Sequence, residues 1–127
     1  MSRRSIDVEG YSHAAAIPVA SRIGPLLASS IIAGFDPGTR NMPDTVEAQV
    51  VNVLHHAGAI LTGGGGTWAD VVKVNFFVTD TEFRTAIEPL WVELFPDAAS
   101  RPARHIQTAQ LPRRVLVQAE FLAYIDH

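Results

Sequence analysis

The stretch Val71-Val72-Lys73-Val74-Asn75-Phe76-Phe77-Val78-Thr79 is rich in β-branched and aromatic residues. Such residues favour a pleated, half-buried strand, so this run predicts a β-strand over residues 71–79. A helical pattern of apolar residues lies on each side of the run. A strand enclosed between two helices is therefore the centre from which the rest of the fold extends.

The helical pattern before this strand is the clearer of the two. Its apolar residues recur at helical spacing and are Val46, Val50, Val53, Leu54, Ala57, Ile60 and Leu61. Asp44 and Glu47 have the spacing of a capping box, with Asp in place of the usual Ser or Thr. Glycines at positions 63–66 end the pattern abruptly. We therefore expect a helix that begins after Asp44 and ends at these glycines.

The helical pattern after the strand lies within residues 82–95. Its apolar stripe consists of Ile87, Leu90, Trp91, Leu94 and Phe95. Pro89 lacks a backbone N–H and is costly in a helix interior, so we expect it to start the helix or to kink it.

Strand patterns occupy both ends of the chain. Ile6 and Val8 alternate with polar neighbours, and the apolar run from Leu26 to Ile32 predicts a strand with much of both faces buried. Two final strands fit about 103–109 and 114–124. The expected order is β-β-α-β-α-β-β in one domain, residues 1–127.

This order favours an α+β fold in which two helices cover one face of a single mixed or antiparallel sheet. The chain has nothing left to cover the other face of the sheet. Self-association through that face is the simple remedy, so we expect a homo-oligomer.

The composition narrows the classes of function. The net charge is −3 and no basic stripe is visible, so nucleic-acid binding is not expected. The chain has no cysteine, which excludes disulfides, thiolate catalysis and Cys-based metal sites, and no His or carboxylate cluster indicates another metal site. The N-terminal segment lacks the apolar region of a signal peptide, and no run is long enough to span a membrane. We expect a cytoplasmic protein without a cofactor.

Motifs near the C-terminus resemble the signature of a known family. They are Arg101-Pro102-Ala103-Arg104, then Leu111-Pro112, then Leu116-Val117-Gln118-Ala119-Glu120. In order and spacing they are similar to the RidA/YjgF family, also called endoribonuclease L-PSP-like, and the resemblance covers roughly residues 17–125. It implies a fold like that of trimeric chorismate mutase, a homotrimer with sites between adjacent subunits, and enamine/imine deaminase activity. Such enzymes hydrolyse 2-imino acids to 2-keto acids and ammonia.

The resemblance also implies roles for individual residues. Arg104 falls on the arginine that grips the substrate carboxylate. The glutamate that handles the attacking water is replaced by Gln118, and an asparagine on the second helix is replaced by Glu88. The N-terminal tyrosine falls on Ile17, and the glycine that offers its backbone N–H falls on Ile31. We count Trp91, one helical turn after Glu88, with the substrate-binding residues.

Chemistry separates these candidates by role. A planar guanidinium such as that of Arg104 matches a carboxylate with two parallel hydrogen bonds but does not act as a base. The amide of Gln118 can position water but cannot accept its proton. Two carboxylates are candidate catalytic groups in its place: Glu88, and Glu120, which lies on the same strand face as Gln118 about 7 Å away. The alternative is that Glu120 pairs with an arginine and Glu88 is solvated.

Two histidine positions have structural readings that compete with functional ones. His105 directly follows Arg104 and points to the opposite strand face, where packing is the simpler role. His55 and His56 diverge by about 100° on a helix and cannot both face one ligand.

Two functions remain open on these grounds. The first is an enamine/imine deaminase whose small carboxylate-bearing ligand is held by Arg104. The second is a non-catalytic trimeric binder of small carboxylates, a sensor or holdase, which Gln118 favours. Ribonuclease activity, implied only by the older family name, is disfavoured by the acidic charge balance.

Overall fold

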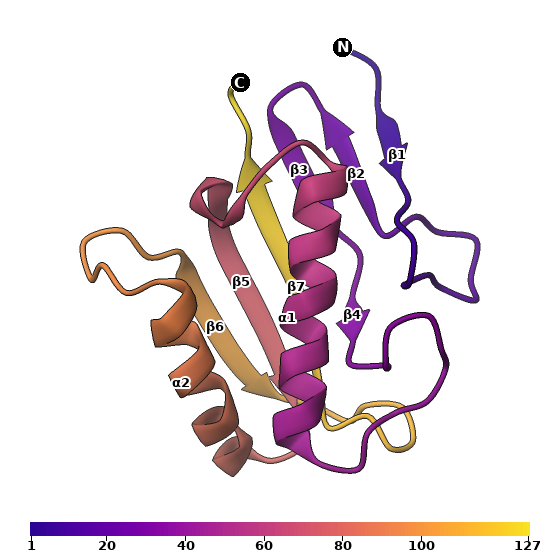
Figure 1. Cartoon of the computed structure of the whole chain (residues 1–127), viewed down its shortest axis with the longest axis vertical. Helices are drawn as coiled ribbons and strands as arrows, with labels where there is room; N and C mark the ends of the chain where they lie inside the picture. Colours follow the sequence, from indigo (N-terminus) through magenta and orange to yellow (C-terminus); the bar gives the residue numbers. More distant parts are fainter.

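Strands β5 (Val71–Val78) and β7 (Val117–Tyr124) pair antiparallel at the centre of one sheet, as Figure 1 shows for the computed structural model, which describes all residues 1–127. Strand β6 (Ala103–Thr108) lies at one edge and is parallel to β5. On the other side of β7 follow β3 (Leu26–Ser29), β2 (Ala20–Ile23) and β1 (Arg4–Ile6), all antiparallel. The two-residue strand β4 (Ile32–Ala33) also pairs with β7. The sheet is therefore mixed, as expected.

Helices α1 (Val46–Gly63) and α2 (Arg84–Leu94) both cover the same face of this sheet (Figure 1). Two short 3-10 turns, Trp68–Asp70 and Thr81–Phe83, precede β5 and α2. The core lies between helices and sheet, and its largest fully buried side chains include Phe76, Leu27, Ile32, Ile60, Leu61 and Ile87. The predicted α+β class and the placement of both helices on one face are confirmed. Neither helix has the length and hydropathy that crossing a membrane requires.

The first helix is capped one residue later than predicted. Thr45 has an extended backbone and its hydroxyl accepts a hydrogen bond from the amide of Ala48, so Thr45 is the N-cap. Asp44 instead pairs with Arg114 at 2.8 Å. The predicted capping box of Asp44 and Glu47 is wrong. The N-cap is the last residue before the helix, and Thr45 occupies that position, so Asp44 lies one residue too early to cap it.

The N-terminal half of the sheet also differs from the prediction. The run 26–32 is two strands, β3 and β4, separated at Ser30 and Ile31, and Leu26 is exposed rather than buried. Strand β2 was not predicted; it pairs with β3 across Gly24, whose φ of +54° lies in the left-handed region that glycine adopts easily. The observed order is therefore β-β-β-β-α-β-α-β-β.

Two boundaries near the C-terminal half are corrected as well. Helix α2 begins at Arg84, so Pro89 lies inside it rather than at its start, with its ring exposed. The last strand begins at Val117, because Arg114 has a φ of 71° and the amide of Val115 bonds back to Pro112 in a turn.

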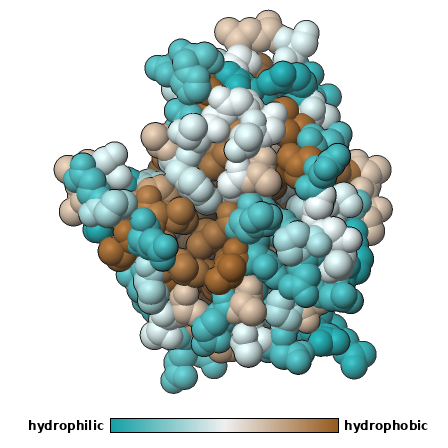
Figure 2. Space-filling view, in the orientation of Figure 1, coloured by the Kyte–Doolittle hydropathy of each residue, from teal (hydrophilic) through white to brown (hydrophobic).

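The second face of the sheet is open. Along β7 the residues Val117, Ala119, Phe121 and Ala123 are buried under the helices, and the alternate residues point away from them. On that open face, Leu26, Leu122 and Tyr124 are 47%, 38% and 54% exposed. On the helix side, Figure 2 shows apolar side chains gathered between the two helices, where a groove is lined mainly by Val51, Leu54, Trp68, Leu90 and Leu94.

Candidate functional site

Arg104 lies on the edge strand β6 and points to the helix side of the sheet. Its register partner on β5 is the buried residue Val74, and strand partners share a face. The guanidinium donates a hydrogen bond through Nη2 to the carboxylate of Glu88 on α2. Its Cζ atom lies 4.9 Å from the centroid of the Trp91 ring, a cation–π contact. Glu88 and Trp91 are three residues apart on α2 and so face the same way.

The environment of Arg104 leaves part of its hydrogen-bonding capacity unused. Its side chain is 19% exposed, while that of Glu88 is 48% exposed. The Nη1 atom is buried and has no hydrogen-bond partner within the chain. Buried polar groups are nearly always satisfied, so an unpaired guanidinium nitrogen marks a position where an external acceptor would be stabilised.

Gln118 and Glu120 lie on the other face of the sheet. Gln118 pairs with Phe77 and Ala33, and Glu120 pairs with Asn75. Both are partly buried and alternate with the core residues of β7, which matches the expectation that they share a face. Within one chain they therefore do not join Arg104, Glu88 and Trp91. The chain brings one of the two candidate carboxylates to the guanidinium and leaves the other on the open face.

Ile17 and Ile31 are on the N-terminal side of the sheet. Ile17 is 48% exposed in the loop before β2, and Ile31 is partly buried between β3 and β4.

The hydroxyl of Tyr11 accepts a hydrogen bond from the Ala33 amide at 2.7 Å and donates to the Ile31 carbonyl at 3.5 Å. Tyr11 thus holds the backbone of the segment that contains Ile31. No spacing pattern in the sequence singled out Tyr11, since its contacts are with residues about twenty positions away.

Tyr11 packs against the rings of two histidines, His13 and His56, which form no metal site. The Tyr11 and His56 rings lie 4.4 Å apart, and Nε2 of His56 donates to the Phe35 carbonyl at 2.7 Å. Burial is the main cause that lowers the pKa of His56, and likewise that of His13. His55 is exposed whereas His56 is buried, so the predicted divergence of the pair is confirmed. No group of three His, Asp or Glu side chains is arranged to hold a metal ion.

His105 lies on the open face, as strand alternation predicts. It pairs with Asn75 on β5 and is exposed. It therefore lies on the same face as Gln118 and Glu120 rather than beside Arg104.

Known proteins share both the sequence and the fold of this chain. Residues 5–125 match the family model described as Endoribonuclease L-PSP. A RutC family protein of Synechocystis is 34% identical over 94 residues, 72% of either chain. A RutC family protein of Pyrococcus horikoshii is 31% identical over 92 residues, 71% of either chain.

Solved structures agree with this match. RidA from the Antarctic bacterium Psychrobacter is 28% identical, with a TM-score of 0.88 over 96% of this chain and 99% of that one. A member of the conserved Rid protein family from Yersinia pestis, 23% identical with a TM-score of 0.89 over 98% and 100% of the two chains, shares the fold. The family match and the relatives above 30% identity show that this chain belongs to the RidA/YjgF family, the endoribonuclease L-PSP family.

Proposed function

We propose that the protein is an enamine/imine deaminase that hydrolyses a 2-imino acid to a 2-keto acid and ammonia. The contact between Arg104 and Glu88 carries the proposal, because it puts a carboxylate anchor and a proton acceptor side by side. The Nη1 of Arg104 is buried and has no partner within the chain, and in this proposal it pairs with a substrate carboxylate oxygen. Trp91 also contacts the guanidinium, through the cation–π interaction.

In this proposal Glu88 acts as the general base, in place of the glutamate that Gln118 replaces. Water adds to the carbon of the C=N bond while the Glu88 carboxylate accepts one of its protons. Glu88 passes this proton to the nitrogen, which gives a neutral carbinolamine. As the carbinolamine collapses, its hydroxyl proton moves through Glu88 to the nitrogen, the C=O bond forms and the C–N bond breaks to release ammonia. Gln118 cannot do this, since an amide does not take up a proton near neutral pH.

The assembly is proposed to be a homotrimer with sites between protomers. Gln118 and Glu120 lie on the sheet face away from Arg104, so within this scheme they approach an Arg104 of a neighbouring protomer. Ile17 and Ile31 join them from the same neighbour as walls of the pocket. The exposed apolar residues Leu122 and Tyr124 support burial of the open face in such an assembly.

The test is an imine-trapping assay. An amino-acid oxidase supplies 2-imino acids, semicarbazide traps them, and an active protein lowers the trapped signal. Arg104→Ala should abolish the effect, and Glu88→Gln should reduce it by roughly 10²–10⁴-fold, the usual contribution of a general base. Glu93→Gln, an exposed carboxylate on the same helix, is the matched control. Glu120→Gln is run in parallel, and full activity in both Glu88→Gln and Glu120→Gln would refute catalysis by these carboxylates.

Gln118 supports a second candidate, a non-catalytic trimeric binder of small carboxylates. In that case no imino acid is hydrolysed, but a keto acid or benzoate still binds, and Arg104→Ala removes the binding. Light scattering of the same samples measures the number of chains per particle and tests the trimer independently of either function.

A further inference from the structure

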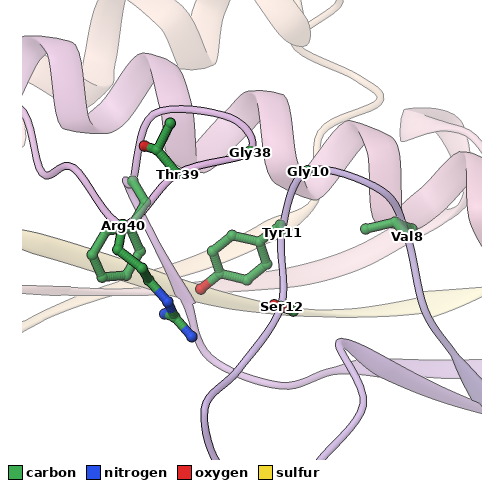
Figure 3. A pocket seen from close by; sticks show the side chains of 8 residues that line it. Val8, Gly10, Tyr11, Ser12, Gly38, Thr39 and Arg40 are labelled. Atoms are coloured by element: carbon green, nitrogen blue, oxygen red, sulfur yellow. The ribbon is translucent and has the colours of Figure 1, made fainter.

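A groove lies on the side of α1 that faces away from α2, between the N-terminal loop and the loop from β4 to α1 (Figure 1). Its larger part is a cavity of about 400 Å³, and Figure 3 shows six of the residues used here: Gly10, Tyr11, Ser12, Gly38, Thr39 and Arg40. A second cavity of about 290 Å³ continues past Arg40 towards Arg113 and Arg114. Cavities of this size accept small organic molecules.

Arg40 stands where the two cavities meet. Its Cζ atom lies 5.2 Å from the centroid of the Phe35 ring, and both residues line both cavities. Figure 3 shows its guanidinium pointing towards the Tyr11 hydroxyl. The ion pairs of the chain involve other residues, so the charge of Arg40 has no carboxylate partner.

A second polar group, next to the Tyr11 wall of the groove, also lacks a partner. The Nε2 atom of His13 is buried and makes no hydrogen bond. The ring of His13 packs edge-on against Tyr11, with centroids 5.4 Å apart. After burial, the charge of Arg40 is the further cause that lowers the pKa of His13. A bound anion would satisfy the ring nitrogen and the guanidinium together.

The walls of the groove are held in place without a ligand. The amide of Gly38 donates to the carbonyl of Gly10 at 2.8 Å and joins the two loops. At the other end, the buried amide of Gln49 donates to the carbonyls of Pro43 and Arg114 at 2.8 and 3.0 Å. A preformed site loses little entropy when its ligand binds.

Three arginines lie along the groove of a chain whose net charge is −3. Arg40, Arg113 and Arg114 line the groove, and only Arg114 is neutralised, by Asp44 at 2.8 Å. Asp36, beside Phe35, accepts a hydrogen bond from the Asn52 amide at 2.9 Å and forms no ion pair with these arginines. The excess of guanidinium groups favours an anionic ligand.

We propose that this groove binds a small phosphate monoester, with its phosphate between Arg40, His13 and Ser12. A planar carboxylate is satisfied by one guanidinium, whereas a tetrahedral phosphate has three peripheral oxygens for donors that come from different directions. The ester group extends past Arg40 towards Arg113. The site is independent of the proposed deaminase reaction, because it uses none of the residues at Arg104.

The test follows backbone amide shifts of the isotope-labelled full chain during titration with inorganic phosphate, glycerol phosphate and acetate at constant ionic strength. Both phosphates should shift the amides of residues 10–13 and 38–40. Arg40→Gln should weaken binding roughly tenfold to a hundredfold, the loss of one charge-assisted contact. Arg84→Gln, which removes an exposed arginine at the start of α2, should leave binding unchanged.

Three results would overturn the proposal. They are equal binding by acetate, unchanged phosphate affinity in Arg40→Gln, and loss of phosphate binding in Arg104→Gln, which would place the anion at the other site. Ser12→Ala, a small change in an exposed loop, provides a second variant of the groove and should weaken phosphate binding less than Arg40→Gln.

Discussion

The guanidinium of Arg104 on β6 is hydrogen-bonded to the carboxylate of Glu88 on α2, sixteen positions earlier in the chain. This contact places the negative charge of Glu88 next to Arg104, the residue proposed to hold a substrate carboxylate. An incoming carboxylate must therefore share the guanidinium with Glu88 or displace it.

Replacing Glu88 by glutamine should strengthen the binding of an unreactive carboxylate such as benzoate. The variant removes the charge that competes for Arg104 and keeps a side chain of the same size. Because partly exposed ion pairs contribute about 0.2–1 kcal/mol, the gain should be up to about fivefold. Titration calorimetry measures it, with Glu93→Gln as the control, and weaker benzoate binding in Glu88→Gln would show that the two carboxylates do not compete.

Gln49 should be essential to stability. It is fully buried, donates to the Pro43 and Arg114 carbonyls and accepts from the Leu116 amide at 2.8 Å. Gln49→Leu leaves these groups without partners, so we expect a loss of about 2–4 kcal/mol in the free energy of unfolding, measured with urea. Gln49→Glu should be at least as damaging, because a carboxylate repels both carbonyls. A loss below about 1 kcal/mol in Gln49→Leu would mean that water replaces the amide.

Two glycine-to-alanine changes should have opposite effects on unfolding. A Cβ atom at Gly34 would lie 2.4 Å from the backbone oxygen of Gln49, so β4 and α1 must move apart, and we expect a loss of about 1–3 kcal/mol. A Cβ atom at Gly58 meets the Trp68 ring only at 3.5 Å. Alanine is the better helix former, so Gly58→Ala should gain about 0.5–1 kcal/mol. Thermal denaturation measures the midpoint temperature, Tm, of both variants. Equal shifts in Tm would contradict the close approach at Gly34.

Stability should fall below neutral pH because of buried histidine. Burial lowers the pKa of His56, so the folded chain binds its proton less readily than the unfolded chain does. The stabilisation is complete above the ordinary pKa of about 6.5 and declines as the pH falls through that value towards the lower folded pKa. Urea unfolding at several pH values between 7.5 and 5 measures this decline. The free energy of unfolding of His56→Gln should fall less steeply with falling pH than that of the native chain.

His13 provides a second contribution with the same sign, since burial lowers its pKa as well. The free energy of unfolding of His13→Gln should therefore decline less steeply with falling pH than that of the native chain, and His105→Gln, at an exposed position, is the control. An identical pH dependence in all four proteins would contradict the role of burial.

The elements that the sequence predicted well have patterns that are local. The apolar residues of α1 and α2 recur every helical turn, and β5 is a continuous β-rich run, so short windows suffice. Strand β2, Ala20-Ser21-Arg22-Ile23, has no such pattern. Arg22 is held by the carbonyl oxygens of Gly24, Gly64 and Ile125, and the strand exists because β1 and β3 pair with it.

The candidate site likewise has one part that the sequence predicted and another that depends on the tertiary structure. The motif Pro102-Ala103-Arg104 indicated Arg104 as a candidate carboxylate anchor, but nothing in the motif specifies which sheet face Arg104 occupies. Alternation along a strand is fixed locally, whereas the face itself depends on the register with the next strand. Arg104 pairs with buried Val74 and faces the helices, while Gln118 pairs with Phe77 and faces away.

The sequence by itself determined the family, the α+β class, both helices, the presence of Arg104 and the amide of Gln118 at the position where the family resemblance implies a glutamate. The tertiary structure alone decided that Glu88, rather than Glu120, contacts Arg104 within the chain, and that the His13 ring packs against Tyr11 at the groove that Arg40 lines. The reason is physical. Periodicity and capping are encoded within a few residues, but contacts between strands, helices and loops depend on pairings over long stretches of chain, which no single segment specifies.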